Sequence, residues 1–600
     1  MCEITGVLNF NENNKKFQFN LDNSVKKMNF NDQNNSGYFF YEKYAIFFNG
    51  NFFNYKTYIK ELKTDGVNFI SETDIEVLLY LLIKYGTNAI EKINGGFIFA
   101  FYNLSNNQCI IARDRFGIKT LYYYIDEKNF FFASKLKTLL KYSFKQELNY
   151  DVLKTFFQLN YIPENQCIIK NVKKLKPGSY LFINDNNEII NEPYYKICNV
   201  NIKTNNTNNE NYNDSCKKLY ELLNDSVKMR LTADFPVGCF LSGGIDSSII
   251  TALAANNTTN LNTFSIGFNN NKFFDETKIA EIVAKKFNTN HTSFKVSNQD
   301  LLENITNVLE YSDEAFADSS ALAINILSKL TSKKLNIVLS GDGADEIFAG
   351  YNKHLAHFQI LNIGTKEKII ANLNYLWKIL PKSRNSKITN IFRQLYRFSN
   401  AYKLSPQERY WNWASIANEK YINELLLVKP NEEEYQKFKN EYINFDFATI
   451  NEILYADMNL VLTSDMLVKT NFTIANSLEV RTPFLDHNVV DFAFSLPDNY
   501  KITKNLRKKI LKDSFKNILP EEVFTHPKHG LEVPLTDYLR TDLNFLIENF
   551  LNEKFIKEQN IFNYKIIKNL IKRLHSKNPD DSAAKIWALI CFNKFKINTL

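Results

Sequence analysis

The chain lacks features that mark several classes of protein. Its seven cysteines, at positions 2, 109, 167, 198, 216, 239 and 591, include no C-x-x-C pair, which argues against a disulfide framework and a zinc site and favours a reducing cytoplasm. No run approaches 18 apolar residues, and no apolar segment follows a charged N-terminus, so we expect no membrane partner and no signal peptide. No basic block stands out, and a net charge of +8 over 600 residues requires no nucleic acid.

The composition is that of a globular protein, and we expect several domains because 600 residues are too many to fold around a single hydrophobic core. Up to about residue 195, short runs rich in Phe, Tyr and Ile alternate with polar turns, and 74–85 has the pattern of an amphipathic helix. We predict a strand-dominated domain of two packed sheets with helices outside. Examples of the predicted strands are 44–48, 97–102, 109–112 and 130–133.

An Asn-rich stretch, 199–213, has little to bury and is predicted to be a linker. Beyond it, strands alternate with helices, which predicts a parallel, doubly wound sheet that binds ligands at the carboxyl ends of its strands. The predicted strands are 237–241, 263–267, 292–296 and 335–339, and the predicted helices are 214–230, 247–255, 275–287, 299–311 and 320–330. From about residue 355 the chain is predicted to be mainly helical.

Two glycines follow the first of these strands, in Ser242-Gly243-Gly244-Ile245-Asp246-Ser247. The loop leads into an apolar helix, so its free N–H groups and the helix dipole favour an anion, and the serines add hydroxyl donors. Asp246 suits a Mg²⁺ ion that bridges to phosphate. No lysine follows in the kinase-like phosphate-loop pattern, and a plain strand-to-helix turn remains an alternative for this stretch alone.

A second strand-turn-helix loop reads Ser340-Gly341-Asp342-Gly343-Ala344-Asp345-Glu346. Its three carboxylates would repel one another without a cation, and Mg²⁺ is the natural one. An acidic helix N-terminus is the ordinary alternative. Two such loops on one sheet favour a phosphate and metal site.

Together these two loops closely resemble the ATP-pyrophosphatase loops of glutamine-dependent asparagine synthetases. Further matches are Ala112 to Gly117, Thr263 to Phe268, Phe316 to Ser320, Leu478 to Asp486 and Pro527 to Gly530. The resemblance covers nearly the whole chain. It implies an α+β N-terminal-nucleophile glutaminase sandwich over 1–198, the linker 199–213, and an α/β ATP-pyrophosphatase domain with a helical C-terminal part over 214–600.

The resemblance implies that ATP adenylates the β-carboxylate of aspartate and that ammonia then displaces AMP to give asparagine. It assigns pyrophosphate and ATP to Leu241, Ser242, Gly243, Gly244, Asp246, Ser247, Ile266, Ser340 and Gly341. It assigns Mg²⁺ to Asp246 and Asp345, and places Lys528 near the phosphates. Asp342 or Glu346 would assist the attack of the amine. For Glu479 and Arg481, aspartate binding and a structural ion pair both stay open.

In the family, an N-terminal cysteine, matched here by Cys2, attacks glutamine with its own α-amine as base. Asn49 and Gly50 match the oxyanion hole, and Asn51 and Asp74 match the rest of the glutamine pocket. Ammonia would then cross a largely apolar interior to the second site.

The sequence departs from the family at several positions. Glu3 replaces glycine beside the nucleophile, Asn51 replaces a pocket glutamate, and no arginine precedes Arg113 to bind the glutamine carboxylate. Only a lysine such as Lys26 or Lys43 is left for that role. We therefore hypothesise weak or lost glutaminase activity. The family's Asp-Arg pair before the Glu-Val-Arg motif is Thr470-Asn471 here, which we interpret as local drift.

Two alternatives remain besides a cytoplasmic asparagine synthetase. One is a synthetase of the same fold that amidates another carboxylate, including the β-lactam-forming type that has lost its cysteine. The other is a non-catalytic ATP-binding homologue, which would predict damage at Asp246, Asp345 or Lys528 that the sequence does not show. The sequence leaves a homodimer open.

Overall fold

The computed structural model describes residues 3–10, 17–18, 36–198, 200, 211–233, 235–268, 276–383, 387–525 and 533–599. Cys2, Lys26 and Lys528 lie outside these residues. No helix in these ranges is long and apolar enough to cross a membrane.

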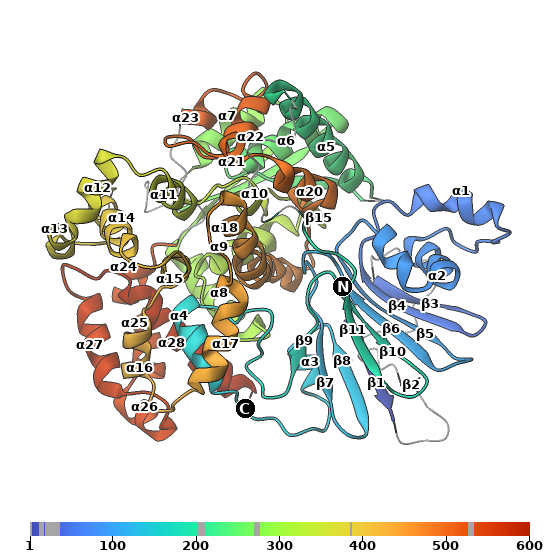
Figure 1. The fold of residues 1–600 in the computed structure, drawn as a ribbon, viewed down its shortest axis with the longest axis horizontal. Helices are drawn as coiled ribbons and strands as arrows, with labels where there is room; N and C mark the ends of the chain where they lie inside the picture. The colour runs from blue at the N-terminus through green and yellow to red at the C-terminus, as the bar shows by residue number, and fades with distance from the viewer. Residues whose placement is uncertain are drawn as a thin grey trace.

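Two antiparallel sheets form the N-terminal part (Figure 1), in the strand orders β11-β10-β6-β5-β4-β3 and β2-β1-β8-β7-β9. Alternate residues of β4 face opposite ways: Ala45 and Phe47 fill the core between the sheets, and Ile46 and Phe48 pack beneath α2. This confirms the predicted pair of packed sheets with helices outside. The bounds are β1 Thr5–Asn9, β2 Phe17–Gln18, β3 Ser36–Tyr41, β4 Tyr44–Gly50, α1 Lys56–Thr64, α2 Asp74–Tyr85, η1 Gly86–Lys92, β5 Phe97–Asn103, β6 Gln108–Arg113, β7 Tyr122–Ile125, β8 Asn129–Ala133, α3 Leu136–Leu139, α4 Asp151–Leu159, β9 Lys173–Lys174, β10 Ser179–Ile183 and β11 Ile189–Pro193.

A third sheet, after the linker, is parallel throughout, in the order β14-β13-β12-β15-β16. The predicted parallel sheet is confirmed, and the short edge strand β16 is an addition to it. Helix α5 begins at Tyr212, two residues inside the predicted linker. The bounds are α5 Tyr212–Leu231, β12 Val237–Phe240, α6 Ile245–Asn257, β13 Asn262–Phe268, α7 Thr277–Lys286, β14 Asn290–Val296, α8 Asn298–Tyr311, α9 Ser320–Thr331, β15 Ile337–Leu339, α10 Ala344–Ile347 and β16 Glu479–Arg481.

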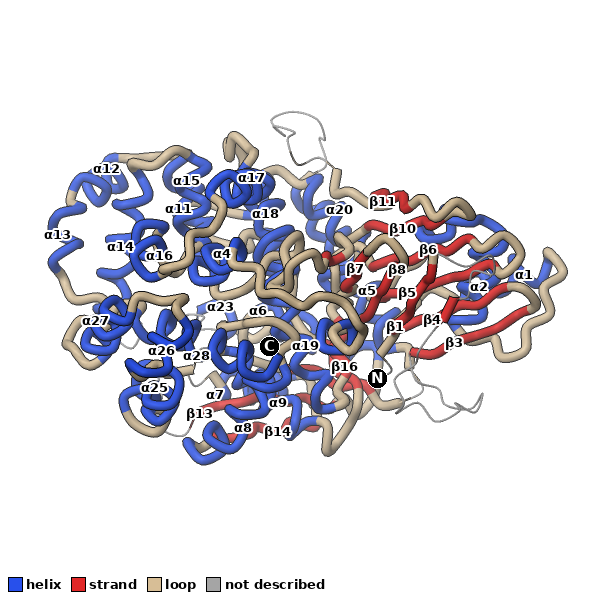
Figure 2. Tube along the Cα trace, turned by 90° about the horizontal axis from the view of Figure 1, so that it is seen from below, coloured by secondary structure: helices blue, strands red, loops and turns tan. Residues whose placement is uncertain are grey.

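Helices make up most of the chain after residue 351, as predicted, and they surround the parallel sheet and extend away from the first domain (Figure 2). They are α11 Asn352–Leu361, α12 Thr365–Asn372, α13 Asn374–Ile379, α14 Lys387–Tyr402, α15 Pro406–Ala414, α16 Glu419–Leu425, α17 Glu432–Ile443, α18 Ile450–Asp457, η2 Met458–Met466, α19 Leu467–Asn471, η3 Phe472–Asn476, η4 Pro483–Leu485, α20 His487–Ser495, α21 Asp498–Lys501, α22 Lys509–Phe515, α23 Glu522–Thr525, α24 Leu535–Arg540, α25 Asn544–Phe550, α26 Glu553–Gln559, α27 Tyr564–Leu574 and α28 Ser582–Thr599.

Helix α4 joins the helical half although it precedes the linker in sequence. The ring of Phe157 lies 5.4 Å from that of Phe562 and 5.6 Å from that of Phe592, both in edge-on contact. Lys154 Nζ contacts Glu432 Oε2 at 2.7 Å. The two halves of the chain thus share one continuous apolar core.

Candidate functional site

The Ser-Gly-Gly loop and the acidic loop lie side by side because the strands before them are neighbours. β12 pairs in parallel with β15, with Cys239 opposite Leu339, so both segments leave the sheet at its carboxyl edge. A Cβ atom on residue 341 would lie 2.8 Å from Asp246 Cβ and 2.9 Å from the Ser247 nitrogen. The loops therefore touch, and glycine at 341 provides the space.

Hydroxyl groups close the first loop on itself. The Ser242 N–H donates to Ser247 Oγ over 3.1 Å, and Ser247 Oγ donates to the Gly244 carbonyl over 3.1 Å. Gly243 has a φ of +82°, a backbone conformation that residues with a side chain rarely adopt. The turn leads into the first turn of α6, whose N–H groups are oriented for an anionic ligand.

Carboxylates of the acidic loop point to separate partners. Asp342 Oδ2 accepts hydrogen bonds from Ser340 Oγ and Thr470 Oγ1, both at 3.0 Å. Glu346 Oε1 accepts from the Tyr351 hydroxyl at 2.6 Å. The residue that replaces the family's aspartate, Thr470, therefore touches the acidic loop.

Lys508 bridges the third carboxylate to the first loop. Its Nζ lies 2.5 Å from Asp246 Oδ1 and 2.6 Å from Asp345 Oδ1, and all three side chains are nearly buried. The two carboxylate oxygens thus converge on one cation. Sequence reasoning missed Lys508 because it is the middle of three consecutive basic residues, Arg507 to Lys509, and nothing in the pattern distinguishes it.

A buried chain of hydrogen bonds holds Glu346. Burial and the charge of Asp345 raise the pKa of Glu346 to about 7. The Tyr351 N–H donates to His354 Nδ1 at 3.2 Å, and His354 Nε2 lies 2.7 Å from Asp457 Oδ2. Burial lowers the pKa of His354, so the ring is neutral and donates its Nε2 proton to Asp457.

A cavity of about 170 Å³ opens at this edge of the sheet. Both loops line it, together with parts of β13, α19 and β16. The structure brings ten of the candidate residues to its wall, and Gly243 and Gly244 form the turn behind it. The ten are Leu241, Ser242, Asp246, Ser247, Ile266, Ser340, Gly341, Asp342, Asp345 and Glu346.

The candidate oxyanion residues lie at the end of β4. Gly50 has a φ of +140°, and a Cβ there would come within 2.1 Å of the Gly96 carbonyl oxygen. The same oxygen accepts a hydrogen bond from the Asn51 N–H at 2.9 Å. Asn49 and Asn51 are buried. The close backbone approach accounts for glycine at position 50.

The Glu-Val-Arg motif lies against this region. Arg481 Nε donates to Glu479 Oε1 at 2.5 Å, and a second guanidinium nitrogen lies 3.5 Å from Asn51 Oδ1. Burial and then the charge of Glu479 raise the pKa of Asp74 to about 6. The ion pair left open by the sequence is therefore present, and it faces the first domain.

Asp486, at the end of the same motif, also joins the two halves. It accepts hydrogen bonds from Arg230 at 3.0 Å and from Asn94 at 2.8 Å. Arg230 and Arg481 both lie over the ring of Phe53, 4.9 Å and 5.2 Å from its centroid. The segment 478–486 thus provides many of the contacts between the two halves of the chain.

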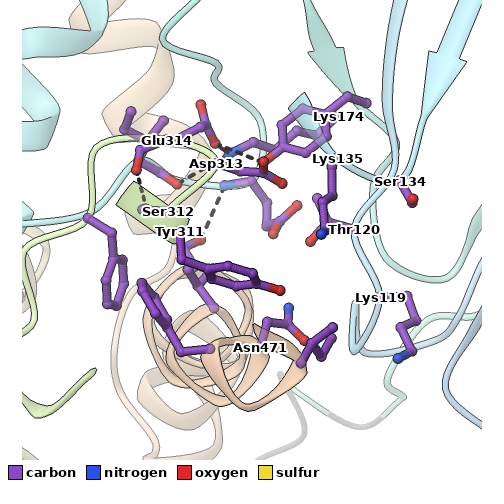
Figure 3. Close-up of a pocket in the computed structure, with 18 of the residues that line it drawn as sticks. Lys119, Thr120, Ser134, Lys135, Lys174, Tyr311, Ser312, Asp313, Glu314 and Asn471 are labelled. Atoms are coloured by element: carbon purple, nitrogen blue, oxygen red, sulfur yellow. Dashed lines mark hydrogen bonds and ion pairs between the residues drawn. The ribbon is translucent and has the colours of Figure 1, made fainter. Parts of the chain in front are cut away.

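A second cavity, of about 120 Å³, lies between the halves and reaches Asn49 (Figure 3). Apolar side chains line part of it, but its lining also includes three lysines and four acids, so the passage is less apolar than expected. The charged residues labelled in Figure 3 are Lys119, Lys135, Lys174, Asp313 and Glu314. Two departures from the family pattern, Glu3 and Asn471, line the same cavity.

Charges in this cavity, which we call the inter-domain cavity, are mostly paired. Glu3 Oε1 lies 2.6 Å from Lys135 Nζ, and Lys174 pairs with Glu314. Burial alone would raise the pKa of Glu3, but hydrogen bonds from Lys135 and Thr138 outweigh it and the pKa is lowered. The negative charge of the carboxylate expected beside Cys2 is therefore partly offset by the charge of Lys135.

One short helical segment separates the two cavities. Met466, Thr470 and Thr473 line the cavity at the loops, whereas Val468 and Asn471 line the inter-domain cavity. These residues belong to α19, to the end of η2 before it and to η3 after it. Thr470 and Asn471 therefore face different cavities from one wall, which makes their departure from the family more than a surface change.

Lys43 does not reach the glutamine pocket. It lies in the turn before β4, next to the ring of Tyr44, whereas Asn49 and Gly50 end that strand. A strand rises about 3.3 Å per residue, so the lysine is roughly 20 Å away. The interpretation of Lys43 as a substitute for the missing arginine is wrong. Cys2, Lys26 and Lys528 are outside the described residues.

Comparison with known proteins agrees with this geometry. The asparagine synthase family model matches residues 218–597, and the glutamine amidotransferase domain matches residues 31–195. Asparagine synthetase (glutamine-hydrolysing) 1 of Bacillus subtilis is 30% identical over 92% of this chain and 85% of its own. Asparagine synthetase (glutamine-hydrolysing) 3 of the same organism is 27% identical over 81% and 75%, and amidase chyE of Penicillium rubens is 22% identical over 81% and 76%. The chain belongs to the asparagine synthase family.

Proposed function

We propose that this chain converts aspartate to asparagine with ATP, through a β-aspartyl adenylate, using nitrogen from glutamine or free ammonia. The observation that carries the proposal is the convergence of the Ser-Gly-Gly loop and the acidic loop on one cavity, with Lys508 between Asp246 and Asp345. A cation and a helix N-terminus at one cavity suit a leaving pyrophosphate.

Roles follow from what each group can do. The loop 242–247 supplies N–H and hydroxyl donors for pyrophosphate, and Leu241 and Ile266 offer apolar surface to the adenine. Glu346, with a pKa raised to about 7, can accept the proton that the attacking amine loses. Lys528 would add a second charge near the phosphates.

The donor set fits Mg²⁺. Asp246 and Asp345 present two carboxylate oxygens to one point, and within the described ranges no cluster of three or more His, Cys, Asp or Glu side chains could hold a metal. Mg²⁺ is commonly held by one or two carboxylates with water and phosphate oxygens completing its shell. When bound, the ion would neutralise charge on the phosphates.

We assign the glutaminase to residues 1–198, with 199–213 as the linker and the synthetase over 214–600, in a cytoplasmic enzyme. Cys2 would be the nucleophile, Asn49 and Gly50 the oxyanion hole, and Asn51 and Asp74 parts of the glutamine pocket. The location of Asn49 on the inter-domain cavity supports ammonia transfer toward α19.

The test is the release of pyrophosphate and AMP with ATP, Mg²⁺ and aspartate, with ammonium as nitrogen source. Asp246→Asn should lower the rate by at least about a hundredfold, because the site then loses one of the two carboxylates that would hold Mg²⁺ at the phosphates. Asp214→Asn, at an exposed acid at the start of α5, is the control. Full activity of Asp246→Asn would refute the enzyme assignment.

One observation favours a second candidate acceptor. Among the described residues, the lining of the cavity at the two loops, which we call the ATP cavity, has five acids and no Lys or Arg, and the nearby Lys508 is already paired with Asp246 and Asp345. An α-carboxylate normally needs a cation. Amidation of an acid that lacks a free α-carboxylate would satisfy the same cavity. A panel of carboxylic acids, assayed for AMP formation, separates the two: aspartate should give the highest kcat/KM under our first proposal.

A further inference from the structure

Exposed apolar side chains gather at one end of the molecule. Of the 18 large apolar residues that are exposed in the described chain, eight fall within the 31 residues from Leu361 to Ile391. Tyr375 is 77% exposed, Ile388 64% and Ile379 62%. The eight are Leu361, Ile369, Leu373, Tyr375, Leu376, Ile379, Ile388 and Ile391. Leu361 ends α11 and the others belong to α12, α13, α14 and the turn after α12, and we call the eight the α12–α14 patch. Exposed patches of this kind mark interaction surfaces.

The net charge of the protein is concentrated in the same segment. Residues 361–403 hold nine of the 73 basic residues and one of the 65 acidic ones, which accounts for the whole net charge of +8. Over the rest of the chain the two signs balance, so the expectation that no basic block stands out fails for this segment. The single acid, Glu367, accepts a hydrogen bond from the Gly364 N–H at 2.9 Å and is engaged in capping α12.

Several cations of this segment point to solvent. Lys366, Lys368, Lys378 and Lys403 are exposed, whereas Arg393 pairs with Asp581 at 3.0 Å. Lys504, whose carbonyl accepts from the side chain of Gln359 in α11, adds a further exposed positive charge beside α12. The apolar side chains therefore have lysines among and around them.

These helices have little core of their own. Ala371 is the only buried residue in α12, and α13 has none. Figures 1 and 2 both show α12, α13 and α14 at the end of the molecule farthest from the two antiparallel sheets. An edge of this kind can meet a large flat surface without obstruction from the first domain.

We propose that the α12–α14 patch binds the surface of a lipid bilayer that carries anionic headgroups. Helices that lie in the membrane interface combine apolar side chains with lysines and with aromatic residues at headgroup level, and Tyr375 and Trp377 supply the aromatics. Anionic lipids attract exposed lysines. The earlier expectation of no membrane partner rested on the missing transmembrane run, which does not bear on surface binding.

Charge argues against the other occupants. Two copies related by a twofold axis would bring this positive segment against itself. Protein interfaces are depleted in lysine, whereas lysine is common where helices lie on anionic membranes. An anionic bilayer is therefore the occupant that complements both the apolar side chains and the charge.

The experiment is flotation of the full chain with vesicles of phosphatidylcholine, with and without about one third phosphatidylglycerol. The wild-type protein should float with the anionic vesicles only, and less so above physiological salt, about 0.15 M. Each of Lys366→Glu and Lys368→Glu should weaken partitioning at least about fivefold, because one cation near an anionic surface contributes about that factor. Lys217→Glu, a 77% exposed site on α5, should leave it unchanged.

Apolar variants complete the test. Ile369→Gln, Tyr375→Gln and Ile379→Gln combined should abolish flotation while ammonium-dependent AMP formation without vesicles stays at the wild-type rate. Ile70→Gln, Leu427→Gln and Phe545→Gln combined, at exposed sites elsewhere, are the matched control. The absence of wild-type flotation, or equal loss in both triple variants, would overturn the proposal. So would a dimer that only the first triple variant dissociates, or binding to immobilised polyglutamate in place of vesicles.

Discussion

At the residue scale, the lysine between the two loops occupies the point at which we propose that Mg²⁺ binds. Lys508 Nζ contacts Asp246 and Asp345, so without a ligand its ammonium keeps two buried carboxylates from repelling each other. We expect that, once Mg²⁺ and ATP bind, the same ammonium moves from the carboxylates to the phosphates. Lysine suits this exchange because its point charge sits on a flexible stem.

Replacing Lys508 should therefore affect both catalysis and stability. We expect Lys508→Gln to lower AMP formation by about a hundredfold or more, through lost charge at the phosphates. Without Mg²⁺ it should unfold about 3–5 kcal/mol more easily, because two buried carboxylates lose their partner. Added Mg²⁺ should raise the melting temperature of the variant more than that of the wild type. Lys509→Gln, next in sequence and paired with Asp513 at the surface, is the control; equal behaviour of the two variants would contradict this account.

A second lysine is buried with no carboxylate of the described residues within ion-pair distance. Lys501, at the end of α21, donates to Asn451, and burial lowers its pKa to about 7. The unfolded chain therefore binds a proton that the folded chain does not bind between about pH 7 and 10.4, so this residue makes stability rise with pH across that window.

Lys501→Met should stabilise the protein at pH 7, because it removes the cost of burying an amine. The advantage over the wild type should shrink by about 3 kcal/mol between pH 7 and 10, as the native amine no longer has to lose a proton on folding. Thermal melts of both proteins across this range measure it. Lys504→Met, at an exposed neighbouring site, should show no such trend, and a constant difference between Lys501→Met and wild type would disprove the buried-amine explanation.

At the element scale, the meeting of β4 with the turn before β5 depends on one glycine. A Cβ on Gly50 would lie 2.1 Å from the Gly96 carbonyl oxygen, and the φ of +140° is strained for any side chain. Gly50→Ala should lower the free energy of unfolding of the first domain by about 2 kcal/mol or more and remove any glutamine-dependent activity, since Asn49 adjoins this contact.

A matched glycine tests the same change without the contact. Gly37 lies on the neighbouring strand β3, and a Cβ there would have nothing within 4 Å. Gly37→Ala should leave the melting temperature and glutamine use unchanged. Ammonium-dependent synthesis should persist in both variants, because the parallel sheet is separate; loss of ammonium-dependent synthesis in Gly50→Ala alone would show that the damage spreads beyond the first domain.

The elements that the sequence predicted are those whose residues carry local signals. The apolar runs that end at Ser242 and Ser340 specify strand, turn and helix within a dozen residues, so the two loops and their shared edge could be predicted. β16 was missed because Glu479 to Arg481 is short and polar. The packing of α4 was missed because periodicity shows that a helix has an apolar face, but not which surface covers it. Lys508 was missed because its role arises only from tertiary contact.

At the scale of the whole molecule, two cavities lie on either side of α19. Asn471 faces the inter-domain cavity, and Thr470 faces the cavity at the loops and binds Asp342. Nitrogen released near Asn49 would have to pass this wall. The inter-domain cavity carries Asp313, whose pKa burial raises to about 6, so at neutral pH its carboxylate stabilises ammonium over ammonia.

We therefore expect free ammonia to be the better nitrogen source. The kcat/KM for asparagine formation with ammonia should exceed that with glutamine by at least about tenfold, because the glutamine pocket lacks its arginine, Lys43 is distant, and a pocket acid is replaced by Asn51. Parallel assays of glutamate and asparagine formation with each nitrogen source measure this. Equal values for the two sources would refute it.

Asn51→Glu provides the sharpest check, because the structure already holds a partner for the restored acid. The Arg481 guanidinium lies 3.5 Å from Asn51 Oδ1, and a carboxylate there would form a charge-assisted hydrogen bond to it. Glutamine-dependent kcat/KM should rise several-fold while the ammonia-dependent value stays constant, since the ATP cavity is untouched. A parallel rise in both values would mean that the substitution acts on the domain interface rather than on the glutamine pocket, because Arg481 belongs to the motif that joins the two halves.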